Sequence, residues 1–562
     1  MRLSGTTTGS TPLSSPEFHA EITPSHLENK TAFRDEVYVN SESDNVVPIV
    51  DRRENNELSR SLKQRHIQMI ALAGAIGTGL FLSLGGALQT GGPLGALLGY
   101  AFVGAVVCAV QFALGEVSAL FPVTGSFVRH AEFIFDPALG FAVGWNVVYG
   151  TYLSVPSEIS AALVLIQYWT DKYPALWITI FIVITFLVGI VFVGVYGEVE
   201  FFFAMLKILL VVGVVIMGLI IDLGGVSGQE RIGFRYWSNP GPFVEYLSSG
   251  SWGQFLGFWA VMNNAVYSFA GVESLSVAAA ETQNPRQNIP KACKRVFARV
   301  TILYLLSVLI VGMLVPSNDS ALDDYSGTAS ESPFVIAATR AGINAVPSII
   351  NAIVLTSAWS ASNQSLLAGT RILYGLALKK QAPQVFLRTT KYGIPYVCVI
   401  LQTLVATLAY MSLSNGALTV FYWFLDLTAA GTLVSWSVIL FNHIRLHQGL
   451  KKQGIAKEEL PWHHWWTPYT SWAALASCIL FLLTGGFSVF VNGNWDTATF
   501  ISSYLDIPLV IVAYSGWKIF KRTKIIPLDE IPIRDALDEI VRAPEEKIPP
   551  SRGWRRLNIF WG

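Results

Sequence analysis

The chain has 562 residues, of which 52% are hydrophobic and 14% are charged, and its 38 lysines and arginines balance 38 acidic residues. This composition excludes an ordinary soluble domain and favours a membrane protein that crosses the bilayer many times. The zero net charge gives no sign of a nucleic-acid partner. The four cysteines lack the spacing of metal ligands, so we expect neither a metal site nor a disulfide framework.

The N-terminal segment is polar, and residues 1–50 are rich in Ser, Thr, Asp and Glu. It contains neither the apolar stretch nor the cleavage site of a signal peptide, so the first membrane span is expected to direct insertion. We predict a disordered cytosolic tail over residues 1–65.

Hydropathy predicts about twelve membrane-spanning helices separated by polar loops. They lie near residues 66–88, 94–121, 139–167, 175–195, 199–223, 252–280, 297–315, 346–377, 395–413, 417–442, 471–491 and 501–519. The predicted fold is therefore an all-α polytopic membrane protein whose twelve-helix core covers residues 66–520.

The charges of the loops predict the orientation. Lysines and arginines gather after the sixth, eighth and tenth spans, and the loop after the seventh span is acidic. Under the positive-inside rule the basic loops and both termini are cytosolic, including a C-terminal tail over residues 521–562. The acidic loop is then external, where Asn318 heads a glycosylation sequon and residues 333–342 are expected to form a short helix.

Glycines interrupt the middle of the first span, at Gly74, Gly77 and Gly79. Each costs roughly 1 kcal/mol of helix propensity relative to alanine, and open backbone at membrane depth must find partners in protein, ligand or a wet cavity. We expect a break whose amide and carbonyl ends hold the carboxylate and ammonium of a zwitterion such as an amino acid. A small-residue seam for helix packing is the alternative, and the residues alone leave both open.

The sixth span carries a second candidate break, because Gly271 and Glu273 lie within its apolar run. It follows the first span by five spans, as an inverted five-plus-five repeat requires. The repeats are then about residues 66–223 and 252–442, with extra helices over 471–519. Glu273 is interpreted either as a substrate-binding residue or as a structural carboxylate that joins two helices.

Three further charges lie deep in predicted spans and should face the interior of the bundle: Glu116, Glu158 and Lys207. Lys207 is a candidate proton carrier or a fixed cation, and a static salt bridge is the alternative. The two glutamates fit structural roles better. Hydroxyl residues in the eighth span serve either as contacts between helices or as an ion site.

The tenth span combines aromatic residues, including Tyr422, with the carboxylate of Asp426. The aromatic residues are candidates for one wall of a pocket. If Asp426 faces that pocket, it favours cationic substrates. If it instead caps a helix break before Thr428, it says nothing about specificity.

Several runs resemble the fungal amino acid permeases of the amino acid-polyamine-organocation superfamily. They are GAIGTGLF, FPVTGSFVRHAEFIFDPALGFAVGWN, GEVEFFFAMLKI, FAGVESLSVAAAETQNPRQNIPKA and SNQSLLAGTRILYGLA, within about residues 60–520. The resemblance implies the twelve-helix fold with broken helices one and six. It also implies proton-coupled uptake across the plasma membrane, with a central site between spans one, three, six, eight and ten.

The resemblance also implies roles for individual residues. The substrate carboxylate would bind backbone amides of Ala75, Ile76, Gly77, Thr78 and Gly79, and the ammonium would bind carbonyls of Phe269, Ala270 and Gly271. Phe269 is expected to close over the substrate as a gate, Lys207 to match a lysine of relatives that takes the place of a sodium ion, and Thr428 to lie near positions that tune side-chain preference.

The chain also departs from the family pattern. Specificity cannot be borrowed from one relative, because Val155, Pro156 and Ser157 precede Glu158 where many members have a bulkier residue. Ser157, Glu158, Tyr422 and Asp426 are the specificity candidates. The final residues, Phe560, Trp561 and Gly562, replace a common palmitoylation signal, so that anchor is not expected.

The sequence as a whole predicts a secondary transporter that imports amino acids with protons by alternating access. No nucleophile-base constellation, phosphate-binding loop or metal cluster is recognised, so we expect neither an enzyme nor a cofactor. The expected partners are the amino acid, the proton, the lipid bilayer and trafficking factors or a ubiquitin ligase on the tails. The alternatives are a permease for choline, polyamines or another organic cation, with Asp426 as its partner, and an amino acid sensor that does not transport.

Overall fold

The structure is a computed structural model that describes residues 77–545, apart from 124, 192, 227, 229, 274–283, 323–331, 344, 392, 492 and 543. All regular secondary structure in these residues is helical. The predicted N-terminal tail and the first half of the first span, including Ala75 and Ile76, lie outside the described residues.

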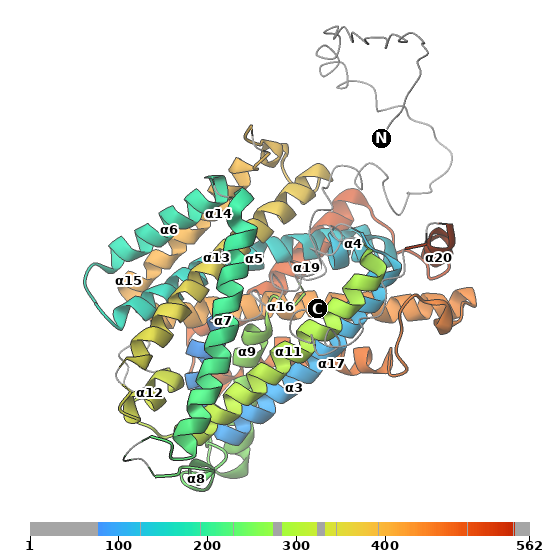
Figure 1. The fold of residues 1–562 in the computed structure, drawn as a ribbon. Helices are drawn as coiled ribbons and strands as arrows, with labels where there is room; N and C mark the ends of the chain where they lie inside the picture. The colour runs from blue at the N-terminus through green and yellow to red at the C-terminus, as the bar shows by residue number, and fades with distance from the viewer. Residues whose placement is uncertain are drawn as a thin grey trace, which may run out of the picture. The chain divides into compact units, whose positions relative to one another are not determined.

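The helices follow one another along the chain in the order of Figure 1. The first part contains a π-helix, η1 (Gly79–Ser83), then α3 (Leu84–Leu120), α4 (Ser126–Ile134), α5 (Pro137–Gln167), α6 (Pro174–Val191), α7 (Val193–Asp222), α8 (Arg235–Ser238), α9 (Gly250–Phe269) and α11 (Pro285–Leu314). The second part contains α12 (Pro333–Arg340), α13 (Val346–Leu378), η3 (Gln384–Leu387), α14 (Tyr396–Ala406), η4 (Thr407–Met411), α15 (Ser412–Asn415), α16 (Ala417–Gln453), η5 (Lys457–Glu459), α17 (Tyr469–Thr484), η6 (Phe487–Phe490), α18 (Thr497–Tyr504), α19 (Asp506–Lys521) and α20 (Ile533–Arg542). The short helix expected at residues 333–342 is confirmed as α12.

Helix α3 continues from the predicted first span into the second through a kink at Gly92. Gly92 has φ +75° and ψ 173°, and Pro93 follows it. A Cβ at Gly92 would lie 2.8 Å from the carbonyl oxygen of Pro242, so both the backbone angle and the close approach require glycine. Proline at the next position removes an amide donor and marks the bend between the two helical segments.

Two groups of helices pack within the described residues. Helix α3 runs along α11, as Figure 1 shows, and also packs against α9. In the other group α5 packs against α13 and α16, and α16 packs against α17. The central residues of these contacts are apolar and buried, so hydrophobic packing holds each group together.

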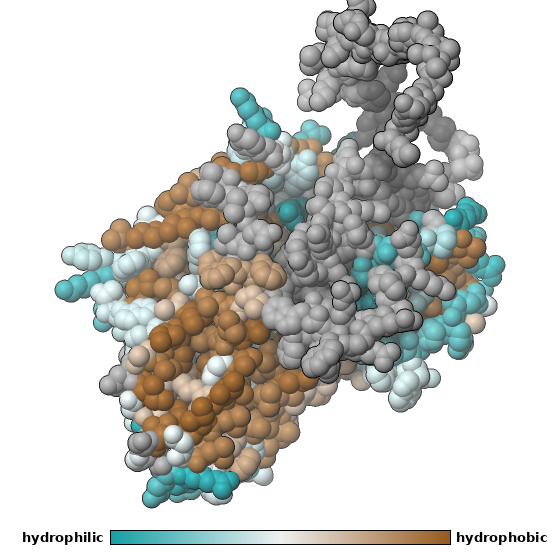
Figure 2. Space-filling view, in the orientation of Figure 1, coloured by the Kyte–Doolittle hydropathy of each residue, from teal (hydrophilic) through white to brown (hydrophobic). Residues whose placement is uncertain are grey.

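The outer surface is strongly apolar on the face drawn in Figure 2, with hydrophilic residues at the end near α8. Helix α7 contributes to the apolar surface with Phe202 at 63% exposure and Leu209 at 62%. Exposed apolar area of this kind is typical of contact with lipid.

Among the described residues, length and composition identify four helical stretches able to cross a membrane: Gly79–Leu120, Glu200–Asp222, Tyr396–Asn415 and Ala417–Gln453. A fifth is added when α18 and α19, bent by 43°, count as one span. The count of twelve spans and the inverted repeat therefore stay predictions.

The C-terminal tail is helical in part. Helix α20 lies within the predicted tail, and the side chains of Ile531 and Ile533 lie against Gly449 of α16. The guanidinium of Arg534 donates to the carbonyl of Gln453 at 2.9 Å. Residues 528–534 are therefore packed on the end of α16.

Candidate functional site

Helix α9 ends at Phe269, inside the apolar run where a helix was expected to be interrupted. Ala270 has φ −59° and ψ 148°, which is not helical, and Gly271 has φ +88° in the left-handed region that glycine tolerates. The last carbonyl groups of a helix have no partner inside it. The end of α9 therefore presents main-chain carbonyls and the negative end of the helix dipole.

The beginning of the first described helix lies against this end of α9. Gly77 lies in a bend and Thr78 in a turn, and η1 begins at Gly79. A Cβ at Gly79 would lie 3.0 Å from Cα of Ser268 and 3.0 Å from Cδ1 of Tyr267, so glycine allows the two helix ends to meet. One element thus presents its amide end next to the carbonyl end of the other.

A buried carboxylate, that of Glu158 on α5, lies beside both ends. The hydroxyl of Thr78 donates to Glu158 Oε2 at 3.0 Å, and the hydroxyl of Tyr267 donates to Oε1 at 3.4 Å. The Ser157 hydroxyl lies 3.3 Å from that of Tyr267. Glu158 is only 5% exposed. The structure therefore joins the first described residues, α5 and α9 through one carboxylate.

Lys207 on α7 continues this polar cluster. It is 1% exposed and interacts electrostatically with Glu200 and Glu158. The hydroxyl of Ser360, on α13, lies 2.8 Å from each carboxylate oxygen of Glu200. The lysine therefore has two buried acids as electrostatic partners, which compensate its charge.

Sequence reasoning missed Glu200 and Tyr267. A signal for Glu200 was present, because it lies about two helical turns before Lys207 on α7 and so on the same face. Tyr267 had none, since a tyrosine in an apolar helix looks like any core aromatic residue.

Phe269 is packed into the bundle. It is fully buried, with its ring centroid 4.9 Å from that of Tyr304 on α11 and 6.4 Å from that of Tyr100 on α3. The Tyr304 hydroxyl donates to the Ser268 carbonyl at 2.8 Å, and the Tyr100 hydroxyl lies 3.0 Å from that of Ser268. These contacts fix the end of α9 to α3 and α11, and the role of Phe269 as a gate stays a prediction.

Glu273 follows the end of α9 and contacts α16. The indole N–H of Trp436 donates to Glu273 Oε2 at 3.1 Å. The side-chain amide of Gln111, on α3, donates to the neighbouring Val272 carbonyl at 3.1 Å. The first contact agrees with the interpretation of Glu273 as a carboxylate that joins two helices, and its direct role in substrate binding stays a prediction.

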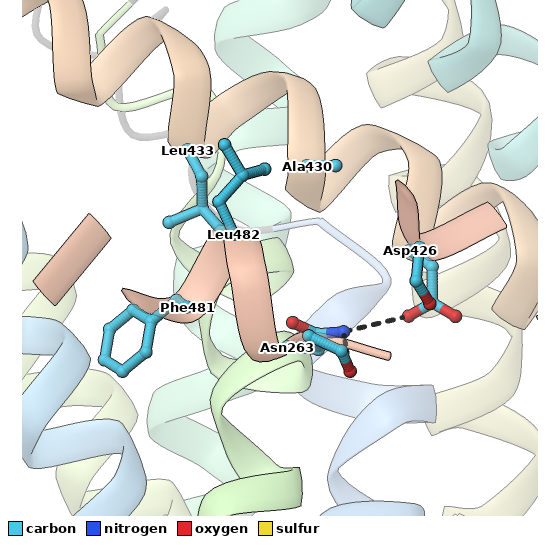
Figure 3. Close-up of a pocket in the computed structure, with 8 residues that line it drawn as sticks. Asn263, Asp426, Ala430, Leu433, Phe481 and Leu482 are labelled. Carbon is cyan, nitrogen blue, oxygen red and sulfur yellow. Dashed lines mark hydrogen bonds between the residues drawn. The ribbon is translucent and has the colours of Figure 1, made fainter. Parts of the chain in front are cut away.

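The residues predicted on the tenth span lie elsewhere in the bundle. Figure 3 shows Asp426 with Asn263, whose side-chain amide donates to Oδ1 at 3.4 Å, and Ser502 donates to Oδ2 at 3.4 Å. A small pocket with a cavity volume of about 10 Å³, partly open to solvent, lies next to them. It is lined by Asn263, Asp426, Ala430, Leu433, Phe481, Leu482, Gly485 and Ser503.

Helix α16 is continuous from Ala417 to Gln453, so the alternative in which Asp426 caps a break before Thr428 is wrong. The stretch lacks proline, and the hydroxyls of Thr432, Ser435 and Ser437 bond to carbonyls four residues earlier in the helix, as that of Thr432 does to the Thr428 carbonyl at 2.9 Å. The buried Thr428 hydroxyl has no hydrogen-bond partner among the described residues. The Tyr422 hydroxyl lies against Gly86 of α3.

The family model for amino acid permeases matches residues 66–528 of the chain, which is most of its length. The chain belongs to the amino acid permease family. This result confirms the resemblance to fungal permeases, and this permease is accordingly a membrane protein of an amino acid transport family. Proteins of this kind are named for transport and not for catalysis.

Three relatives from Saccharomyces cerevisiae show how broad the family is. The dicarboxylic amino acid permease is 37% identical over 501 residues, covering 88% of this chain and 82% of the relative. The proline-specific permease is 36% identical over 516 residues, covering 89% of this chain and 82% of the relative. The lysine-specific permease is 37% identical over 512 residues, covering 90% of this chain and 83% of the relative.

A solved structure supports the fold class. The manganese transporter of Eremococcus coleocola, in complex with an aromatic bis-isothiourea substituted compound, matches with a TM-score of 0.53 at 11% identity, covering 84% of this chain and 95% of that one. At this low sequence identity the match supports the fold and nothing about function.

Proposed function

We propose that this permease imports amino acids across the plasma membrane by proton symport and alternating access. The observation that carries the proposal is the meeting of two helix ends, η1 and α9, beside the buried carboxylate of Glu158. An amide end attracts a carboxylate and a carbonyl end attracts an ammonium, so together they suit the two groups that all amino acids share.

The substrate contacts follow from that arrangement. We assign the carboxylate to the amides around Thr78 and Gly79, with Ala75 to Gly77 continuing the same segment, and the ammonium to the carbonyls of Phe269, Ala270 and Gly271. Because these are main-chain groups, they bind the common part of the substrate and leave side-chain preference to other residues. Ser157, Thr428 and Tyr422 are the candidates for that preference.

Proton coupling is assigned to the buried cluster of Lys207, Glu158 and Glu200. A lysine between two acids can hold or release a proton as the cavity opens to either side of the membrane, since its neighbours carry the compensating charge. The hydroxyls of Thr78 and Tyr267 link the cluster to the substrate segments. A change of charge at Lys207 therefore alters the electrostatic potential at the segments assigned to the substrate.

Alternating access needs two groups of helices that move against each other. The packing of α3 against α9 and α11 supports one rigid group, and the packing of α5 against α13 and α16 supports the other. The Glu158 cluster lies between them, because Thr78 and Tyr267 belong to the first group and Glu158 to the second.

The proposal also includes the membrane and the tails. The charges of the loops support cytosolic termini. The family supports a location in the plasma membrane and trafficking factors or a ubiquitin ligase on the tails. Labelling of cysteines introduced singly at position 30 and at Asp529 tests the orientation, since both should react only from the cytosolic side.

Uptake into proteoliposomes tests the proposed activity. The panel contains radiolabelled acidic, neutral and basic amino acids, proline, choline and a polyamine, each with and without an inward proton gradient. We expect at least one amino acid to accumulate above its external concentration only with the gradient, and a protonophore should abolish this. Equal uptake without the gradient would contradict symport.

Two other results of this panel would replace the proposal. Accumulation of choline or the polyamine alone would make the protein an organic cation permease. Saturable binding of an amino acid with no accumulation would make it a sensor.

The side chain of the substrate cannot be inferred from sequence identity, because relatives named for dicarboxylic amino acids, proline and lysine are equally similar. Asp426 is the candidate partner for a cationic side chain. In Asp426→Asn the amide can keep contacts to Asn263 and Ser502 while the charge is lost. We expect competition by lysine and arginine to weaken at least about tenfold, or about 1.4 kcal/mol, with neutral substrates unchanged.

A matched control for this change is Asp506→Asn, which neutralises another buried carboxylate, on α19. It should leave the preference for cationic over neutral substrates as it is. A uniform loss for all substrates in Asp426→Asn would show that Asp426 is structural.

A further inference from the structure

One polar cluster of the bundle has no part in the proposed transport site. It contains Glu116, near the end of α3, and two histidines of α16, His443 and His447. His447 Nε2 lies 2.7 Å from Glu116 Oε1, and His443 Nε2 lies 3.3 Å from Oε2. The side chains of Glu116 and His443 are fully buried and that of His447 is 10% exposed.

The three side chains have the chemistry and spacing of metal ligands. The histidines are four residues apart on one helix, so their rings project from the same face. One ligand atom from each of the three residues lies within 4.8 Å of the other two. Ligands at about 2.0–2.1 Å from a tetrahedral zinc ion are about 3.3 Å from one another, so small side-chain rotations suffice.

Neighbouring groups hold these ligands in place. The Ser471 hydroxyl lies 3.0 Å from His443 Nδ1, which leaves Nε2 pointing to the carboxylate. That buried Nε2 has no hydrogen-bond partner among the described residues, although it faces Glu116. The Thr467 hydroxyl donates to Glu116 Oε2 at 3.1 Å. Partners of this kind orient ligating histidines and carboxylates in metal sites.

We propose that Glu116, His443 and His447 bind one divalent transition metal ion of the Zn²⁺ class, with water in the fourth position. Two imidazoles and one carboxylate form a ligand set that suits zinc and cobalt. Lys457 is the lysine that acts electrostatically on His443, and its ammonium is engaged by the carbonyls of His464 and Thr467. These two carbonyls therefore hold the ammonium of Lys457 by hydrogen bonds.

The proposed site differs from the expectation from sequence, which was no metal cluster. Glu116 and His447 are 331 residues apart, so only the fold brings them together. The i, i+4 pair of histidines was the sole local signal, and such pairs are common in helices.

A bound metal would join α3 to α16, which belong to the two groups that alternating access moves. On the proposed function, metal binding should therefore slow uptake. This consequence rests on transport, whereas metal binding itself does not, so the two are measured separately.

The test uses the full chain in lipid nanodiscs, purified without a histidine tag. Zn²⁺ is added, free metal is removed by gel filtration, and bound zinc is counted per chain. We expect one zinc per chain in the wild type and affinity weakened at least about tenfold in His447→Gln. His463→Gln, which removes an exposed histidine outside the cluster, should bind as the wild type does.

A second variant gives a decision even if His447→Gln does not fold. His447→Cys keeps a ligand at the position, so Co²⁺ should add a sulfur-to-metal charge-transfer band that the wild type lacks. A hydrogen-bonded cluster with no metal function would give no such band. Absence of stoichiometric zinc in the folded wild type, or equal affinity in a folded His447→Gln, would overturn the proposal.

Discussion

Replacing Lys207 by methionine should abolish accumulation driven by the proton gradient while leaving part of the exchange activity. The change removes the cation that interacts with Glu158 and Glu200 and leaves two buried acids without it. Removal of one partner from a buried ion pair costs about 3–5 kcal/mol, which is large compared with the stability of a protein. Uptake of the preferred amino acid, measured across external pH, should become flat.

Two controls separate coupling from folding in this experiment. The double variant Lys207→Met with Glu200→Gln removes one acid together with the cation, so it should restore yield and thermal stability without restoring the pH dependence. Lys518→Met removes a lysine that pairs with Asp136 outside the cluster, and it should keep the wild-type pH profile. A steep pH dependence in a folded Lys207→Met protein would rule out Lys207 as the coupling group.

Truncation of Phe269 to alanine should give the second large effect. The ring is fully buried against Tyr304 and Tyr100 where α9 ends, so its loss leaves a cavity and loosens that end. Burial of this kind predicts a loss of about 3–5 kcal/mol. We expect a lower melting temperature in detergent and a loss of uptake that exceeds the loss of folded protein.

Two further variants serve as controls for Phe269→Ala. Phe202→Ala removes a phenylalanine that is 63% exposed on α7, and should change stability by less than about 0.5 kcal/mol. Phe269→Leu retains apolar volume and should recover most of the stability. If Phe269→Ala transports as well per folded molecule as the wild type, the ring is not a gate.

The helical elements of the fold follow from hydropathy, but their interruptions follow from single residues. Hydropathy extends the predicted span over residues 252–280, yet α9 ends at Phe269 because Ala270 is extended and Gly271 takes a positive φ. Glycine made a break possible at several positions, including Gly92. Which glycine the chain uses depends on what packs against it, and a single sequence does not contain that information.

The deep charges were visible in the sequence, whereas their partners were not. Glu158 and Lys207 were identified as interior residues, but the hydroxyl of Thr78 that contacts Glu158 is 80 residues away in the chain. Glu273 and Trp436 are 163 residues apart. Contacts of this range are made by the fold, so residue type alone left the roles of Glu273 and Asp426 open.

The direct test of the central claim is a cryo-electron microscopy structure of the permease with its preferred amino acid bound. Main-chain recognition predicts the carboxylate within hydrogen-bond distance of amides around Thr78 and Gly79, and the ammonium within that distance of carbonyls at Phe269 to Gly271. Density for the amino acid only in the pocket beside Asp426, with α9 continuing as an unbroken helix through Gly271, would contradict it.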